Sequence, residues 1–157
     1  KLGKNSTVVL SDNTVKPLLI SDKSDSTLIV HVRNNVPKGT YSIMLDFDIA
    51  HSIMLRKDGN FYLKPVMRCF VRETTASIGG FVLPAKLATK VFVVIGTDTI
   101  TTVSDVKKFN RFKLDGFTAG TYTVQFMPLD SANVTFTRNV EIKKYKDVFL
   151  GRVKVID

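Results

Sequence analysis

The sequence has little of the side-chain chemistry on which enzymes and metal proteins depend. It contains no tryptophan, one cysteine (Cys69) and two histidines, His31 and His51, among 157 residues. A single cysteine excludes an internal disulfide and does not decide the compartment, and its place among apolar residues predicts a buried, inert thiol. His31 is expected on the polar face of a strand. No apolar run approaches the about 20 residues that a membrane-spanning helix needs.

Sequence motifs for catalysis are also missing. The chain has no GxSxG, HExxH, Walker or GxGxxG pattern. Gly79-Gly80 is interpreted as the start of a strand, because no helix pattern follows that could form a phosphate cradle. We therefore expect a non-enzymatic protein without a cofactor.

The charge is basic but evenly spread. With 23 basic and 14 acidic residues the net charge is +9; residues 1–72 hold 11 basic and 6 acidic (+5), and residues 73–157 hold 12 and 8 (+4). Nucleic-acid binders gather their charge in a patch beside a recognisable motif, so no nucleic-acid partner is expected. There are two local clusters, Lys107-Lys108 with Arg111 and Lys113, and Lys143-Lys144 with Lys146. They are interpreted as solvated strand ends, with an anionic polymer or a membrane surface as the alternative.

The stretch 36–72 shows the clearest pattern. From Tyr41 to Ile49 every second residue is apolar, which is typical of a half-buried strand. A turn at Asp58-Gly59-Asn60 and a second alternating run over 61–71 predict an antiparallel hairpin, with a short helical turn at 50–55. The sequence Gly-Thr-Tyr precedes this strand at 39–41 and occurs again at 120–122, where it is expected to begin another strand.

The rest of the chain also reads as short strands. They are expected at 8–10, 15–20, 27–32, 77–84, 89–95, 99–103, 109–114, 121–126, 133–143 and 147–156. Pro17 indicates an edge position, and Gly151 a bulge or close approach. Because no segment shows sustained helical periodicity, the fold class is all-β, with two antiparallel β-sandwich units in series, residues 1–72 and 73–157.

The first 72 residues resemble a known domain. Leu45-Asp46-Phe47-Asp48 with Ser52-Ile53, followed by YLKPVMR at 62–68, is similar to the C-terminal half of the DUF4382 family of exported Bacteroidetes lipoproteins. The resemblance implies a cell-envelope location, periplasmic or at the outer-membrane surface, with a lipid anchor outside this chain as the only membrane contact. It also implies missing N-terminal strands, whose absence leaves an open edge for the second unit or a neighbouring chain to fill.

Residues 76–157 resemble a different family. SIGGFVLP, VFVVI, FKLDGFTAGTYTVQF and LGRVKV are similar to the carboxypeptidase-regulatory or transthyretin-like β-sandwich. Such short motifs support a fold and no particular activity. Some sandwiches of this type carry an intramolecular Lys–Asn isopeptide bond, but the first strand here has no lysine and none is expected.

One cluster suggests a metal site. Asp46 and Asp48 are two residues apart on one strand, and His51 follows closely. Hard cations bind where several oxygen ligands converge, but no further ligand has a recognisable spacing. The alternative is that the carboxylates bond to a turn or pair with Arg56 or Lys64.

A sugar ligand would need exposed aromatic rings. The candidates for ligand binding are Tyr62, Phe109 and Tyr145, with Phe81 and Phe136 as further rings. Core or edge packing is the alternative for each of them.

These observations predict a non-enzymatic binding or scaffold module of an exported lipoprotein, whose partner is a protein or a polysaccharide at the cell surface. One alternative is a structural subunit of a surface appendage that forms homo-oligomers by strand exchange. Another is an accessory domain of a larger enzyme.

Overall fold

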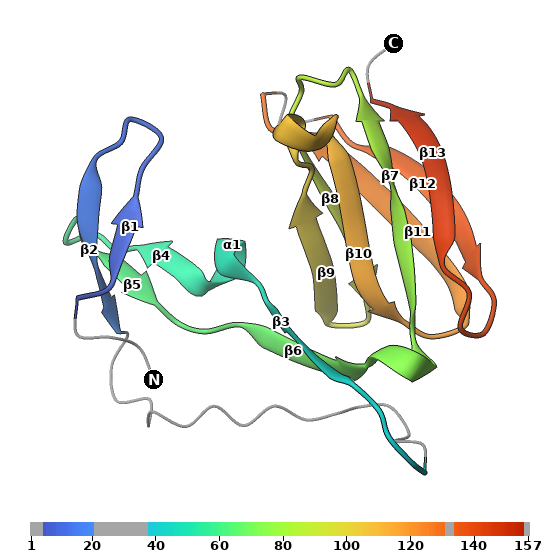
Figure 1. The fold of residues 1–157 in the computed structure, drawn as a ribbon. Helices are drawn as coiled ribbons and strands as arrows, with labels where there is room; N and C mark the ends of the chain where they lie inside the picture. The colour runs from blue at the N-terminus through green and yellow to red at the C-terminus, as the bar shows by residue number, and fades with distance from the viewer. Residues whose placement is uncertain (1–4, 21–37, 131–133, 156–157) are drawn as a thin grey trace. The chain divides into compact units, whose positions relative to one another are not determined.

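A computed structural model of the chain describes residues 5–20, 38–130 and 134–155 (Figure 1). The strand predicted at 27–32, with His31, and the loops on either side of it lie outside these residues. The described part divides into two compact units, one formed by residues 5–20 and 45–69 and the other by 38–44 and 70–155. Within it, no helix is long and apolar enough to cross a membrane.

The all-β prediction is confirmed by the thirteen strands of the described residues. In chain order they are β1 (Thr7–Val9), β2 (Val15–Ile20), β3 (Ile43–Phe47), β4 (Ile53–Leu55), β5 (Phe61–Leu63), β6 (Met67–Val71), β7 (Ala76–Leu83), β8 (Thr89–Ile95), β9 (Asp98–Val103), β10 (Arg111–Phe117), β11 (Gly120–Pro128), β12 (Phe136–Ile142) and β13 (Val148–Lys154). The helical elements are single turns: α1 (Ile49–Ser52), η1 (Arg72–Thr74) and η2 (Val106–Lys108).

The first unit contains one four-stranded sheet in the order β1-β2-β5-β4. Asp58-Gly59-Asn60 forms the predicted turn, here between β4 and β5, in which the Asp58 carboxylate accepts the Asn60 amide at 3.0 Å. Pro17 was predicted at an edge position. Strand β2 is an inner strand of the sheet, but its pairing with β5 begins only at Leu18, so at Pro17 it pairs with β1 alone. The missing N–H of Pro17 therefore interrupts no ladder on the β5 side.

A two-stranded ribbon joins β3 to β6. Backbone bonds from Asp48 to Val66 and from Arg72 to Ser42, both 3.0 Å, show that the strands run in opposite directions. The predicted hairpin is therefore present, but the second predicted strand is broken into β5 and β6. The apolar residues of β3 were expected to be half-buried; this is wrong, since Ile43, Leu45 and Phe47 are 50%, 60% and 40% exposed.

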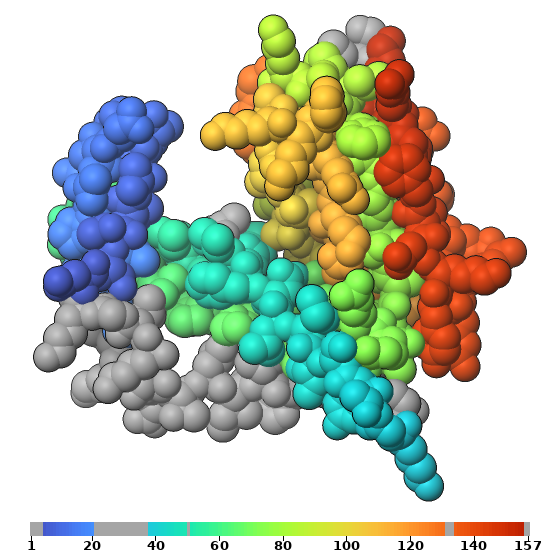
Figure 2. Space-filling view, in the orientation of Figure 1, coloured from blue at the N-terminus to red at the C-terminus, as the bar shows by residue number. Residues whose placement is uncertain are grey.

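The second unit is a β-sandwich of two sheets, β10-β7-β13 and β12-β11-β8-β9. Figure 2 shows the strands of the first sheet side by side, in yellow, green and red. Most pairs are antiparallel, as predicted, but β13 runs parallel to β7, and in the first unit β2 runs parallel to β5. Parallel neighbours require a crossover in the chain, which hairpin patterns in the sequence do not reveal.

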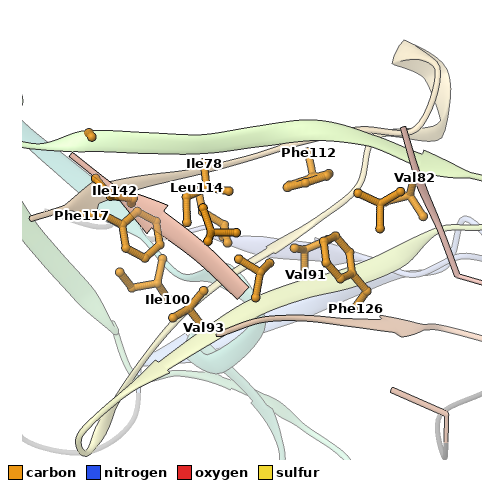
Figure 3. Packing of buried hydrophobic residues seen from close by; sticks show 14 of the residues in the cluster. Ile78, Val82, Val91, Val93, Ile100, Phe112, Leu114, Phe117, Phe126 and Ile142 are labelled. Carbon is orange, nitrogen blue, oxygen red and sulfur yellow. The ribbon is translucent and has the colours of Figure 1, made fainter. Parts of the chain in front are cut away.

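The core of the sandwich lies between its two sheets (Figure 3). Fifteen buried hydrophobic residues form it, and Phe112 of β10 meets Phe126 of β11 edge to face at 5.4 Å. Phe109 and Asn110, predicted to begin a strand, instead adopt left-handed backbone conformations before β10. The buried Asn110 amide donates to the carbonyls of Val82, Pro84 and Leu87 at 2.8 to 3.3 Å, which ties the β7–β8 connection to the start of β10.

The prediction for Gly151 is confirmed. Gly151 has φ +67, and the pairing of β13 with β7 shifts register between Phe149 and Arg152. Cys69, expected to be buried, is only partly so, because its strand β6 pairs with β3 in a ribbon.

Candidate ligand-binding surface

Residues of β7 alternate between the core and the outer face of the sheet. Ile78, Gly80 and Val82 are buried, whereas Gly79 and Phe81 are half-buried between them. Since side chains alternate along a strand, Gly79, Phe81 and Leu83 point to the outer face of the sandwich. Gly79 adds no side chain there, so the backbone of the central strand is not covered by a side chain of its own at this position.

The neighbouring strands place basic and aromatic residues beside this centre. Phe81 is opposite Arg111 of β10 on one side and Arg152 of β13 on the other. Residues paired across strands share a face of the sheet. By the same register Gly79 is flanked by Lys113 and Phe149, and Leu83 by Lys154. We call the resulting surface the aromatic–basic face; it consists of Phe81, Arg111, Lys113, Phe149, Arg152 and Lys154.

The β13 bulge is what brings these residues together. Phe149 and Arg152 are three positions apart, so in a regular strand they would point to opposite faces. The extra residue at the register shift restores both to the outer face. Gly151 supplies the positive φ that this bulge uses.

The two rings on the face contact one another. The centroids of Phe81 and Phe149 are 5.8 Å apart and the rings are 84° to each other. Such an edge-to-face pair is favourable and holds both rings in place. Phe149 is 64% exposed, and therefore presents apolar ring surface to solvent.

The face is electrostatically positive. Strands β7, β10 and β13 carry four basic residues and one acidic residue, Asp115, which gives 4 − 1 = +3. Lys113 pairs with Asp115 at 2.6 Å. Within the described part of the chain Arg111, Arg152 and Lys154 form no ion pair, and all three are exposed. Their charges remain available to an anion.

Of the three residues predicted as metal ligands, Asp48 and His51 contact one another, whereas Asp46 bonds to a different partner. Asp48 accepts the His51 amide at 3.0 Å and contacts its Nδ1 at 2.7 Å, which caps α1. Asp46 instead accepts Arg68 Nε at 2.7 Å. The alternative of a carboxylate bonded to a turn describes Asp48, while Asp46 pairs with Arg68 and not with Arg56 or Lys64. Among the described residues, no three His, Cys, Asp or Glu side chains are arranged to hold a metal ion.

Tyr62, predicted as a ligand-binding ring, is engaged within its own unit. Its hydroxyl donates to Asp58 at 2.9 Å, and the Arg56 guanidinium lies 4.0 Å from the ring centroid. The Asn60 amide and the Tyr62 hydroxyl stabilise the Asp58 carboxylate and lower its pKa. Tyr62 therefore stabilises the β4–β5 turn through its bond to Asp58.

Phe109 and Tyr145 lie at opposite ends of the first sheet of the sandwich. Phe109 precedes Arg111, which pairs near the end of β7, whereas Tyr145 precedes Val148, which pairs near its start. Both are exposed, at 81% and 53%, and Lys144 lies 5.0 Å from the Tyr145 ring. The structure does not bring the two rings into one site. Phe136 packs against the core.

The structure adds Phe149, Arg152 and Lys154 to the predicted ring Phe81 and to Arg111 and Lys113 of the predicted basic cluster. Alternation over β13 could have indicated that Arg152 and Lys154 share a face. The place of Phe149 depends on the bulge, and the parallel pairing of β13 with β7 cannot be read from local sequence.

Comparison with protein-family models and with curated proteins finds no match. The two family resemblances therefore stay predictions. Among solved structures, the crystal structure of BcpA, the major pilin subunit of Bacillus cereus, is similar to this chain with a TM-score of 0.37 and 16% sequence identity. The likeness covers 76% of this chain and 39% of the pilin chain.

Proposed function

We propose that this chain is a non-enzymatic binding module that contacts its ligand through the aromatic–basic face. The observation that carries the proposal is the exposed Phe149 ring, held by Phe81 and surrounded by Arg111, Lys113 and Arg152. An exposed aromatic ring loses solvent contact favourably when a ligand covers it, and exposed cations attract and orient an anionic group.

The construction of the face suits binding. Its residues stand on three hydrogen-bonded strands beside a packed core, so the backbone that spaces them is ordered before a ligand arrives and need not be ordered on association. Placement at a bacterial cell envelope is also part of the proposal, and it rests on the lipoprotein resemblance of residues 1–72.

The test is to map ligand contacts on the whole chain by two-dimensional NMR. Four probes would be titrated separately: an oligogalacturonate, a neutral dextran oligomer, anionic phospholipid vesicles and a single-stranded oligothymidylate. A saturable shift of β7, β10 and β13 amides by at least one probe is expected. If none of them shifts these strands, or if the shifts gather elsewhere, the proposal fails.

A second function, assembly by strand exchange, is favoured by one observation. Ile43, Leu45 and Phe47 alternate along β3 and are all at least 40% exposed. Among the described residues β3 pairs with one strand, β6, and strand exchange would add a strand of a neighbouring chain along its other edge.

Light scattering over a range of concentrations tests this alternative. A mass that rises with concentration in the wild type, and stays monomeric in Leu45→Lys, would support assembly through β3. The binding-module proposal instead expects a monomer at every concentration.

A further inference from the structure

We propose that the ligand of the aromatic–basic face is an acidic polysaccharide, a chain of sugar rings that carry carboxylate groups. This inference rests on the proposed function and specifies the ligand class for the same face.

The first step concerns the ring. Sugar rings present flat C–H faces that pack against aromatic rings. Phe149 is 64% exposed and contacts the Phe81 ring edge to face, with the two centroids 5.8 Å apart, a contact that favours this orientation. Gly79, beside Phe149 in the register, carries no side chain, so a flat ring can approach the sheet next to Phe149.

The second step concerns charge complementarity. Arg111 and Arg152 flank Phe81 from opposite sides, which sets their Cα atoms two strand spacings apart, about 10 Å. Lys113 lies two residues from Arg111 on β10, beside Gly79, and Lys154 lies two residues from Arg152 on β13, beside Leu83. The two lysines therefore extend the positive charge toward opposite ends of β7. Cations therefore border the aromatic centre on both neighbouring strands, and a polymer crossing the sheet meets positive charge before and after the rings. A polymer that repeats a carboxylate matches this pattern, whereas a neutral glycan would leave the cations without partners.

The third step separates this ligand from a single-stranded nucleic acid. Non-specific nucleic-acid surfaces stack successive bases on successive exposed rings. Here the two rings are 84° to each other and Phe81 is half-buried, so they do not form two parallel platforms.

Isothermal titration calorimetry on the full chain tests the inference with length-matched oligogalacturonate, neutral dextran and oligothymidylate. We expect oligogalacturonate to bind at least about tenfold more tightly than either of the others, with an affinity that falls as salt is raised.

The variants are Phe149→Ala and Arg152→Gln. Each is expected to weaken oligogalacturonate binding about threefold to tenfold. Thermal unfolding should be unchanged in Arg152→Gln, whose side chain is exposed, and slightly lowered in Phe149→Ala, which also removes the ring pair with Phe81; circular dichroism checks that both variants remain folded at the titration temperature. Lys90→Gln is the matched charge control. Lys90 lies beside Phe92 at 5.4 Å on β8, in the opposite sheet, so its loss lowers the net charge equally without touching the face.

Tighter binding of oligothymidylate or dextran, still lost in Phe149→Ala, would overturn the inference and leave the proposed function standing. Equal weakening by Arg152→Gln and Lys90→Gln would show that net charge alone attracts the polymer, which would also overturn it. If no probe shifts the NMR signals of the β7, β10 and β13 amides, both this inference and the proposed binding function would be contradicted.

Discussion

At the residue scale, two adjacent glycines have opposite surroundings. A Cβ on Gly80 would lie 2.9 Å from the Gly151 carbonyl oxygen and 3.0 Å from the Phe112 ring, whereas a Cβ on Gly79 would meet the Phe112 carbonyl oxygen at 3.4 Å, an ordinary contact. The difference follows from alternation, because Gly80 faces the core and Gly79 the outer surface.

Gly80→Ala is therefore expected to destabilise the protein by about 1–3 kcal/mol through overpacking. Gly79→Ala, the matched control, should change stability by less than about 0.5 kcal/mol. The free energy of unfolding from urea denaturation measures both. Equal losses for the two variants would contradict the close contact between β7 and the β13 bulge.

At the element scale, the Glu73 side chain links the two strands of the β3–β6 ribbon at one end, because Glu73 follows β6 and its partner Ser42 precedes β3. Both carboxylate oxygens of Glu73 accept the Ser42 amide, at 2.9 and 3.1 Å. These bonds favour the ionised form, and the Ser42 backbone bond is the main reason that the pKa of Glu73 lies below its usual value.

A lowered pKa in the folded state gives a defined pH dependence. The stabilisation is complete above the unfolded-state pKa of about 4.3 and is lost as pH falls through the lower folded-state value. The stability advantage of the wild type over Glu73→Gln should therefore be constant from pH 7 to about 5 and shrink below about 4.3. Unfolding free energies of the two proteins across this range provide the check, and a difference that does not change with pH would contradict the bond.

Elements were easier to predict from sequence than their partners. Periodicity located β7, β8, β9 and β13 to within a few residues, because each has one buried and one solvated face. The two Gly-Thr-Tyr segments, at 39–41 and 120–122, show that the same local sequence does not predict the same burial. Tyr122 packs on Phe117 at 4.9 Å, whereas Tyr41 is 37% exposed, because only the former belongs to a strand within the sandwich.

At the scale of the whole molecule, the buried core is unevenly distributed. All fifteen residues of the main cluster come from residues 76–155. Among the side chains described in the first unit, Leu63 is the one buried hydrophobic residue. Local stability follows buried apolar contacts, so the two units should differ in resistance to opening.

Hydrogen exchange should show this difference. Amides of β7, β8 and β11 are expected to exchange about two orders of magnitude or more slowly than those of β4 and β5. Repeating the measurement at tenfold higher protein concentration is the control for self-association through β3. Equal protection in both units would show that the first unit is stabilised by contacts other than its own described core.

The sequence by itself determined the class of structure and most of the strand positions, because alternation between apolar and polar residues is a local property that reflects burial directly. It also excluded familiar catalytic motifs. Only the tertiary structure decided which strands are neighbours and which side chains share a face. Phe81, Arg111 and Phe149 are far apart in the chain, and they meet because β13 pairs parallel to β7 and bulges at Gly151. That pairing depends on the core between two sheets, which is a non-local balance of packing that no single segment specifies.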